Sequence, residues 1–411
     1  MALGYPSGAM RIRALLLLLL VFAPGLAAQE KTLHLAIGDP ARKEKEARLV
    51  LDGITDTRTG EVLTPAALAK RLGDVRLLLV GESHTDVEFH RAQLRVLQEL
   101  ARSGRPVLLG LEMYPYTEQR YLDQWVDGLL TEEGFLRLSR WYESWGYNWA
   151  YYRDIFLFAR DHKIRMFAVN APRDVVSAVR AKGFDSLSPE EAAHIPRRID
   201  TSSQDHRALF KSFFETDDPL HSGMTEEQWD SMIAAQATWD ATMAHNALKG
   251  LRERGGQDAL MVVLVGSGHV AYGVGIERQA VAQGFDGRIA SVIPVNVEDL
   301  GGQPVRAVQA SYADFIWGLP AQSAAVYPSL GLSTKAGKDS KDLRVILDSE
   351  KTPAAAAGVQ TGDVVLALDG APVPDKETLN RLVAGKQWGD EAVLTVRREG
   401  EKKEIVMPLR R

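Results

Sequence analysis

The chain has 411 residues, of which 45% are hydrophobic and 25% charged, the balance of an ordinary globular protein long enough for two or more domains. Its formal net charge of −5 argues against a nucleic-acid-binding protein, because neutralising phosphates needs a basic face. The absence of cysteine excludes disulfides, thiolate metal ligands, cysteine nucleophiles and the lipidated cysteine of a bacterial lipoprotein.

Residues 1–28 are predicted to be a secretory signal peptide, cleaved near residues 27–28. Arg11 and Arg13 precede the apolar run ALLLLLLVFA, and small residues follow it. The run is short for a membrane span, so an uncleaved anchor is the minor alternative. No other apolar stretch approaches the ~18 residues of a transmembrane helix. We therefore expect a mature chain without a transmembrane segment, located in the periplasm or secreted.

Apolar runs alternate with helical patterns between residues 48 and 319. Continuous apolar runs suit parallel strands that are buried on both faces, and helices between them suit an α/β domain. The predicted strands are 75–80, 105–113, 163–170, 259–266 and 288–295. We expect a mainly parallel sheet in a domain that spans residues 29–320. Two helical insertions, at 117–160 and 171–256, are expected to form a wall beside the sheet.

The helix after the first predicted strand has a capping-box sequence at its start. Thr85 and Glu88 form this T-x-x-E pattern, which predicts a helix that begins just after His84. Helical spacing then turns His90 inward, close to His84.

Two similar segments, GESH and GSGH, each follow a predicted buried strand and supply a histidine, His84 and His269. Their glycines allow sharp turns and close approach of the backbone to a ligand. Because ligands bind beyond the carboxyl ends of parallel strands, we expect both histidines to lie near Glu82 and Glu112. Such a set suits a divalent ion (Fe, Zn or Mn) or an acid/base pair without metal.

Several ordered motifs between about residues 48 and 317 resemble the ChaN family of haem-binding proteins, in the wider Tiki/TraB superfamily. The motifs are GESHTDVEFHRAQ, LGLEMYPYTEQRYLDQW, WGYN, FAVNAPRDVV, QATWDATMA and GSGHVAYGVGIERQ. The resemblance implies an exported protein associated with iron and haem acquisition. Some members bind haem between two subunits, so a homodimer is among the arrangements implied. Some branches of the superfamily are metal-dependent proteases or esterases.

The resemblance also implies roles for individual residues. Four positions match the superfamily's motif residues, and the resemblance implies that they bind a metal or, in an enzyme, belong to the catalytic site: Glu82, His84, Glu112 and His269. Further positions in family motifs are secondary candidates: Asn170, Arg173, Gln236 and Asp240. Haem in the family can be held through tyrosine, and a haem also needs a flat apolar slot. The expected cofactor contacts are therefore Tyr114, Tyr116, His90, Trp141 and Trp145.

Residues 323–411 resemble a small β-rich PDZ domain. The segment Leu330-Gly331-Leu332 matches the loop that binds a chain-terminal carboxylate, and KETLNRLV matches the helix that lines the groove. The expected partner is a peptide or protein C-terminus that adds a strand to the sheet edge.

The leading hypothesis from the sequence is an exported protein that binds haem or a metal ion and uses a PDZ domain to dock a partner. The first alternative is a metal-dependent hydrolase of the cell envelope, with Glu82, His84 and His269 as catalytic residues. The second alternative is an adaptor that works through the PDZ groove and whose sheet-end site is vestigial.

Overall fold

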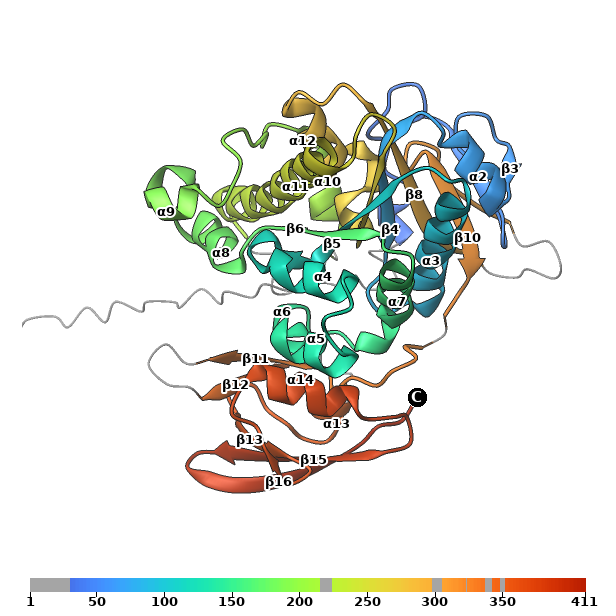
Figure 1. Cartoon of the computed structure of the whole chain (residues 1–411). Coiled ribbons are helices and arrows are strands. Elements are labelled where there is room, and N and C mark those ends of the chain that lie inside the picture. Colours follow the sequence, from blue (N-terminus) through green and yellow to red (C-terminus); the bar gives the residue numbers. More distant parts are fainter. Residues whose placement is uncertain (1–29, 215–223, 298–304, 323, 337–341, 348–351) are drawn as a thin grey trace, which may run out of the picture.

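The computed structural model describes residues 30–214, 224–297, 305–322, 324–336, 342–347 and 352–411. The predicted signal peptide lies outside the described residues. Two units follow one another along the chain, a larger α/β unit and a smaller β-rich unit that holds the C-terminus (Figure 1).

The larger unit is built on an eight-stranded sheet with the strand order β3-β2-β10-β8-β4-β7-β5-β6. Every neighbouring pair from β10 to β6 is parallel, whereas β2 and β3 form an antiparallel edge. The five predicted strands are confirmed as β4 (Val75–Glu82), β5 (Val107–Pro115), β6 (Arg165–Asn170), β7 (Leu260–Gly266) and β8 (Arg288–Val297). The sheet is therefore mainly parallel, as expected.

Further strands of this unit were not predicted from the sequence, and most of them have only two to five residues. They are β1 (Glu46–Val50), β2 (Ile54–Asp56), β3 (Val62–Leu63), β9 (Val305–Gln309) and β10 (Phe315–Pro320). Strands β1 and β9 pair with each other in a separate two-stranded sheet.

Both faces of the large sheet are covered by helices (Figure 1). The first core cluster packs α2 (Pro65–Arg71), α3 (Val87–Arg102), α4 (Gln119–Val126), α5 (Glu132–Leu138), α6 (Trp141–Ser144) and α7 (Arg153–Asp161). The opposite cluster packs α10 (Gln204–Ser212), α11 (Glu226–Arg254) and α12 (Ile276–Ala282). The helices α8 (Arg173–Lys182) and α9 (Pro189–Ala192) lie between these groups in the chain.

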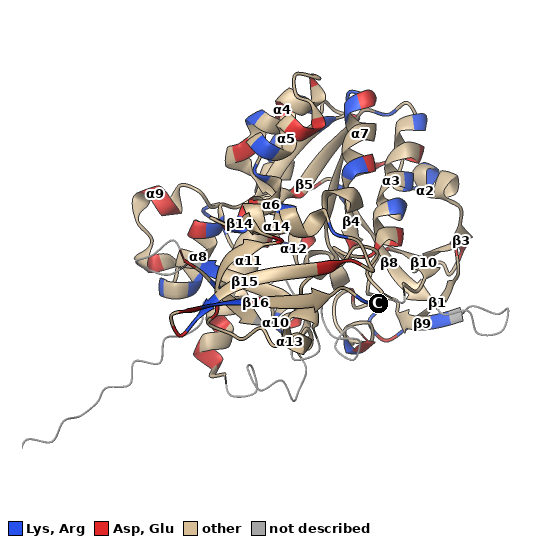
Figure 2. Ribbon diagram, turned by 90° about the horizontal axis from the view of Figure 1, so that it is seen from below, with Lys and Arg blue, Asp and Glu red and all other residues tan. Residues whose placement is uncertain are grey.

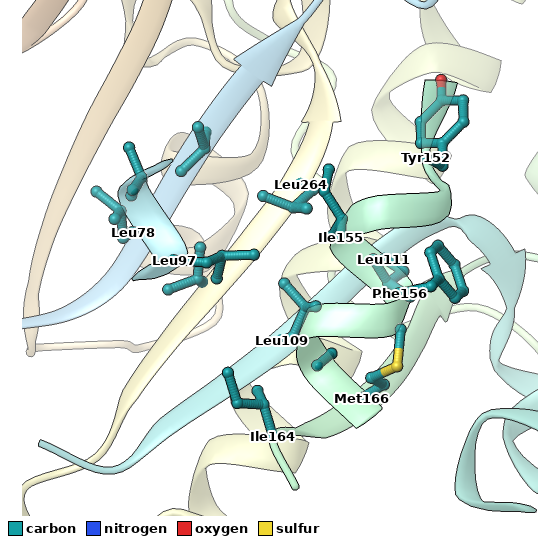
Figure 3. Close-up of a cluster of buried hydrophobic side chains, with 14 of the residues drawn as sticks. Leu78, Leu97, Leu109, Leu111, Tyr152, Ile155, Phe156, Ile164, Met166 and Leu264 are labelled. Atoms are coloured by element: carbon teal, nitrogen blue, oxygen red, sulfur yellow. The ribbon is translucent and has the colours of Figure 1, made fainter. Parts of the chain in front are cut away.

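Strand β4 explains why the apolar runs are continuous. Leu78 packs with Leu97 of α3 and with Leu109 and Leu264 of the neighbouring strands in the first cluster (Figure 3). Leu77 points to the opposite face and belongs to the second cluster. Because successive side chains of a strand alternate between faces, a strand that is covered on both sides needs apolar residues at every position.

The smaller unit is an antiparallel sheet with its own apolar core. Its strands are β11 (Leu332–Ala336), β12 (Leu343–Leu347), β13 (Val364–Leu368), β14 (Ala371–Pro372), β15 (Glu391–Arg398) and β16 (Glu401–Pro408). Its helices are α13 (Pro353–Ala356) and α14 (Lys376–Ala384). Strand β11 lies at one end of the strand order, so one of its edges has no neighbour in the sheet.

Candidate functional site

The register of the parallel sheet places the two Gly-x-x-His segments side by side. Glu82, the last residue of β4, pairs with Gly266, the last residue of β7. Strand β5 is the next neighbour of β7 and ends with the segment that holds Glu112. The site therefore forms where three adjacent strands deliver polar residues to the same edge, which is the usual place for ligands in such sheets.

His84 is fixed by a buried carboxylate on the same strand end. Its Nδ1 atom donates a hydrogen bond to Oε1 of Glu82, and the hydroxyl of Tyr152 donates to the same oxygen at 3.3 Å. Trp145 and Tyr147 contact the imidazole, each with its ring centroid 4.8 Å away. Burial opposes the charge on His84, but Glu82 outweighs burial and raises the pKa of His84 above its ordinary value.

His269 is held by a second set of carboxylates. Its Nδ1 atom lies 2.5 Å from Oδ1 of Asp240 and 3.0 Å from the amide nitrogen of Gln236, and its Nε2 atom lies 3.4 Å from Oε1 of Glu112. Glu112 also accepts a 2.7 Å hydrogen bond from the backbone N–H of Gly266. Burial opposes the charge, but Asp240 and Glu112 raise the pKa of His269 to about 10, so it is an imidazolium at neutral pH.

One member of this set was missed by the sequence analysis. His206 lies on α10, is 2% exposed, and places its Nε2 atom 3.2 Å from Oδ2 of Asp240. Asp240 therefore lies between two histidines that are far apart in the chain. His206 belongs to a helix with no motif, so a single sequence gives no signal that it reaches the site.

The glycines of the two motifs allow close packing of the chain at the site. None of Gly81, Gly266 and Gly268 has a positive φ, so the backbone at these positions does not use the left-handed region that favours glycine. A Cβ atom on Gly81 would lie 2.8 Å from Oγ of Ser267, and one on Gly266 would lie 3.2 Å from Cε1 of His84. Glycine at 266 therefore leaves room for the imidazole.

Replacing Gly266 by alanine is expected to displace the His84 ring by a few tenths of an ångström without unfolding the protein. The free energy of unfolding should change by no more than about 1 kcal/mol. Alanine reduces the backbone freedom of the unfolded chain, and this offsets the crowding between its Cβ atom and the His84 ring. Imidazole nitrogen NMR should show shifted His84 signals in Gly266→Ala. A Gly385→Ala control should leave them in place, because that Cβ meets only a backbone oxygen at 3.4 Å. Unmoved His84 signals in Gly266→Ala would contradict this role.

The helix after β4 begins later than the sequence suggested. Asp86, not Thr85, is the N-cap of α3, and its side chain accepts hydrogen bonds from the N–H groups of Glu88 and Phe89. The inward orientation of His90 near His84 is confirmed: Nε2 of His90 lies 3.2 Å from the carbonyl oxygen of His84. His90 is 3% exposed and is not among the residues that line the cavity, so in this structure it supports the His84 segment.

A cavity of about 470 Å³ opens over these groups. The two helical insertions supply much of its wall, since Trp145 and Tyr147 come from the first, and Phe210, Phe213 and Trp239 from the second. The polar candidates that line the cavity are Glu82, His84, Glu112, Asn170, Arg173, Gln236 and His269. Its volume lies within the range of small-molecule and cofactor sites.

Several predicted cofactor contacts are not at the cavity. Tyr114 and Trp141 are 0% exposed and form part of the first core cluster, where the hydroxyl of Tyr114 forms a hydrogen bond with that of Ser139. Tyr116 is half-buried outside the cavity, with its hydroxyl 2.7 Å from Nδ1 of His194. Trp145 is the one of these four aromatic candidates that lines the cavity.

Within the described ranges, no three or more His, Asp or Glu side chains are arranged to hold one metal ion. The imidazoles and carboxylates of the site are instead paired with one another. The divalent-metal alternative for Glu82, His84, Glu112 and His269 therefore gains no support from this geometry.

The fold and the site define an α/β ligand-binding protein with an appended β-rich module. A family model described as "Haem-binding uptake, Tiki superfamily, ChaN" matches residues 68–279, and a PDZ domain model matches residues 328–409. The chain belongs to this ChaN family and contains a PDZ domain after the family region. Among the residues that the structure describes, no helix is both long enough and apolar enough to cross a membrane.

One solved structure, of cofacial haem binding to ChaN of Campylobacter jejuni, resembles the larger unit. Its TM-score is 0.51 at 17% identity, and the match covers 64% of this chain and 95% of that one. At this identity the likeness shows the shared fold alone.

Each curated relative matches a part of the chain. Protein RETICULATA-RELATED 5, chloroplastic, of Arabidopsis thaliana is 26% identical over 268 residues, which cover 60% of this chain and 34% of that protein. A probable periplasmic serine endoprotease DegP-like of Brucella suis is 39% identical over 77 residues, which cover 19% of this chain and 14% of that protein. The chain therefore spans only a minor part of either relative.

Proposed function

We propose that this protein binds haem in the cavity above the paired histidines, in the context of iron or haem acquisition, and docks a polypeptide C-terminus through its PDZ domain. The observation that favours haem is the environment of His84. Its Nδ1 atom is held by Glu82, while its Nε2 atom makes no hydrogen bond with the described residues and its side chain lines the cavity. A carboxylate behind one nitrogen is the usual support for a metal-ligating histidine, and histidine is a common axial ligand of haem iron.

The cavity walls fit the other parts of a haem, which is a flat apolar ring with two carboxylates. Trp145, Phe213 and Trp239 provide aromatic surface. Arg173 lines the cavity, is exposed, and makes no ion pair with the described residues, so it is available to a carboxylate. When bound, haem supplies an iron with redox and ligand chemistry. The chain's residues hold and orient it: His84 at the iron, Glu82 behind His84, and Arg173 at a propionate.

Export is part of the proposal. It is supported by the pattern of residues 1–28 and by the periplasmic location in the name of the DegP-like relative. The PDZ role is supported by the edge of β11 that no described strand pairs with, and by Leu330-Gly331-Leu332, whose last residue begins β11. An adaptor with a vestigial site would bind a peptide here and would bind no haem.

The haem proposal is tested by titrating hemin into the purified protein and following the Soret band. We expect a shifted band that saturates at one haem per cavity. A spectrum that equals the sum of free hemin and protein at every ratio would contradict haem binding.

Hydrolysis is a second candidate because two histidine–carboxylate pairs face one cavity, His84 with Glu82 and His269 with Asp240. In this reaction the oxygen of water bonds to an ester carbonyl carbon as His84 takes its proton. The bond from that carbon to the leaving oxygen then breaks as His269, protonated at neutral pH, donates a proton.

An acid/base hydrolase should release p-nitrophenol from p-nitrophenyl acetate with a rate that EDTA leaves unchanged. His84→Ala should lower that rate about 100-fold, within the usual contribution of a general base. Loss of activity in EDTA would instead favour the metal-dependent hydrolase. A wild-type rate equal to that of buffer would argue against esterase activity of either kind.

A further inference from the structure

The PDZ domain packs against the same short turn that supplies the aromatic wall of the cavity. Figures 1 and 2 both show α14 of the PDZ domain beside α6 of the larger unit. In the turn that follows α6, Trp145–Asn148, alternate residues contact the cavity histidine and the helix α14. Trp145 and Tyr147 contact the ring of His84. The residues between and after them, Gly146 and Asn148, face α14.

Specific contacts join this turn to one stripe of α14. The side chain of Asn148 donates a 3.1 Å hydrogen bond to the carbonyl oxygen of Ala384, and that of Asn380 donates a 2.7 Å hydrogen bond to the carbonyl oxygen of Tyr142. A Cβ atom on Gly146 would lie 3.1 Å from Nδ2 of Asn380, so glycine is needed for the close approach.

The same stripe runs along α14 from its first turn to its end. Lys376, Asn380 and Ala384 are four residues apart and therefore share one face of α14. Beside Lys376, Oε2 of Glu377 lies 3.7 Å from Nε of Arg140 in the larger unit, so the first turn of α14 also contacts that unit. Leu379, on a different face, packs into the PDZ core together with Leu330 of the carboxylate-loop segment. The face of α14 turned away from its own core is thus covered by the larger unit.

The connection between the two units is anchored at the same place. The side chain of Gln322 accepts a hydrogen bond from the N–H of Val87 and donates one to the carbonyl oxygen of Thr85, both at 3.0 Å, just after His84. Further along, Trp388 of the PDZ domain donates to the carbonyl oxygen of Ala325 at 2.8 Å. The PDZ domain is thus held against the cavity by both the turn and the linker.

We propose that a polypeptide C-terminus in the PDZ groove and a ligand in the cavity oppose each other's binding through the Trp145–Asn148 turn. A peptide that adds to the free edge of β11 and lies along α14 needs the face that the turn now covers. Peptide binding therefore moves the turn away, and Trp145 and Tyr147 leave the cavity wall. Because coupling is reciprocal, a ligand stacked on these aromatics holds the turn in place and weakens peptide binding.

The partner is a chain end whose last side chain is apolar, because Leu330, Leu332 and Val383 offer apolar surface at the carboxylate-loop segment and beside the stripe of α14. The effect of a cavity ligand on peptide binding rests on the proposed haem function, whereas the packing of the turn on α14 does not. The test must therefore separate the two.

The test measures binding of a fluorescein-labelled hexapeptide, with a C-terminal valine and a free carboxylate, to the full chain. Asn148→Asp keeps the oxygen that accepts from the N–H of Ala150 but loses the donor to Ala384. It should bind the peptide about fivefold more tightly than wild type. The reason is that the lost hydrogen bond stabilises only the arrangement in which the turn covers α14. Asn246→Asp is the matched control, since it removes an equivalent bond to the carbonyl oxygen of Val169, which belongs neither to the turn nor to α14.

A second arm adds hemin, which should weaken peptide binding to wild type and have less effect on Asn148→Asp. Hydrogen exchange at residues 141–152 should rise when the peptide is added. Equal peptide affinity in wild type, Asn148→Asp and Asn246→Asp, or no binding to any of them, would overturn the coupling. A flat hemin titration with tighter peptide binding to Asn148→Asp would contradict the haem function and leave the covered groove intact.

Discussion

His269→Ala should destabilise the larger unit by about 3 kcal/mol near pH 6, because it removes the partner of buried carboxylates. Asp240 is 0% exposed and Glu112 is 6% exposed. Without His269 these charges keep fewer partners, although His206 remains beside Asp240. Urea unfolding followed by tryptophan fluorescence measures the loss. His34→Ala, on an exposed histidine that pairs with Glu30, should change stability by less than about 0.5 kcal/mol.

The pH dependence of this effect has a definite sign. The pKa of His269 rises from 6.5 to about 10 on folding, so its stabilising effect is fully present below pH 6.5 and disappears as the pH rises through 10. Asp240 has a lowered pKa because His269 outweighs the effect of burial, so its contribution is lost only when the pH falls below its ordinary value of 3.8. The difference between wild type and His269→Ala should therefore be larger at pH 6 than at pH 10. Equal unfolding midpoints at pH 6 would contradict the paired site.

The second large effect is expected on haem binding. His84→Gln should weaken hemin binding at least about 100-fold, because it removes the proposed iron ligand itself. Glutamine can still donate to Glu82, so the fold should survive, and far-ultraviolet circular dichroism checks this. Hemin titrations followed at the Soret band give the affinity. His162→Gln is the matched control, since His162 is exposed and bonds only within its own helix end.

Glu82→Gln extends the same experiment to the support behind the ligand. It removes the charge that raises the pKa of His84, and it should weaken hemin binding by about 10-fold to 100-fold. If His84→Gln binds hemin as tightly as wild type, then His84 is not the ligand, whatever the result for Glu82.

Much of the fold could be predicted from the sequence because its signals are local. Strands β4 to β8 are covered on both faces, so each appears as a continuous apolar run. The convergence of His84 and His269 followed from a general property of parallel sheets and did not need their exact register. Strands such as β2, with three residues, and the edge strand β3, with two, are too short to give a pattern.

The residues that the sequence misplaced depend on tertiary contacts. Tyr114 stands two residues from Glu112, so regular alternation along β5 would place both on one face. The pairing register is irregular between Leu111 and Pro115, and Tyr114 enters the aromatic core instead. Thr85 has the sequence of a helix cap, yet the neighbouring Asp86 makes the capping bonds and also accepts a hydrogen bond from Asn296. His206 and Tyr152 reach the site from distant helical segments, so their positions follow only from the packed structure.

The central claim is that His84 holds the iron of a haem in this cavity. The most direct test is pulsed electron paramagnetic resonance of the ferric haem complex, prepared with ¹⁵N-labelled histidine in wild type and in His84→Gln. The account predicts strong hyperfine coupling from one imidazole ¹⁵N in wild type and none in His84→Gln. A wild-type complex that shows no imidazole coupling, or the same coupling in both proteins, would contradict it.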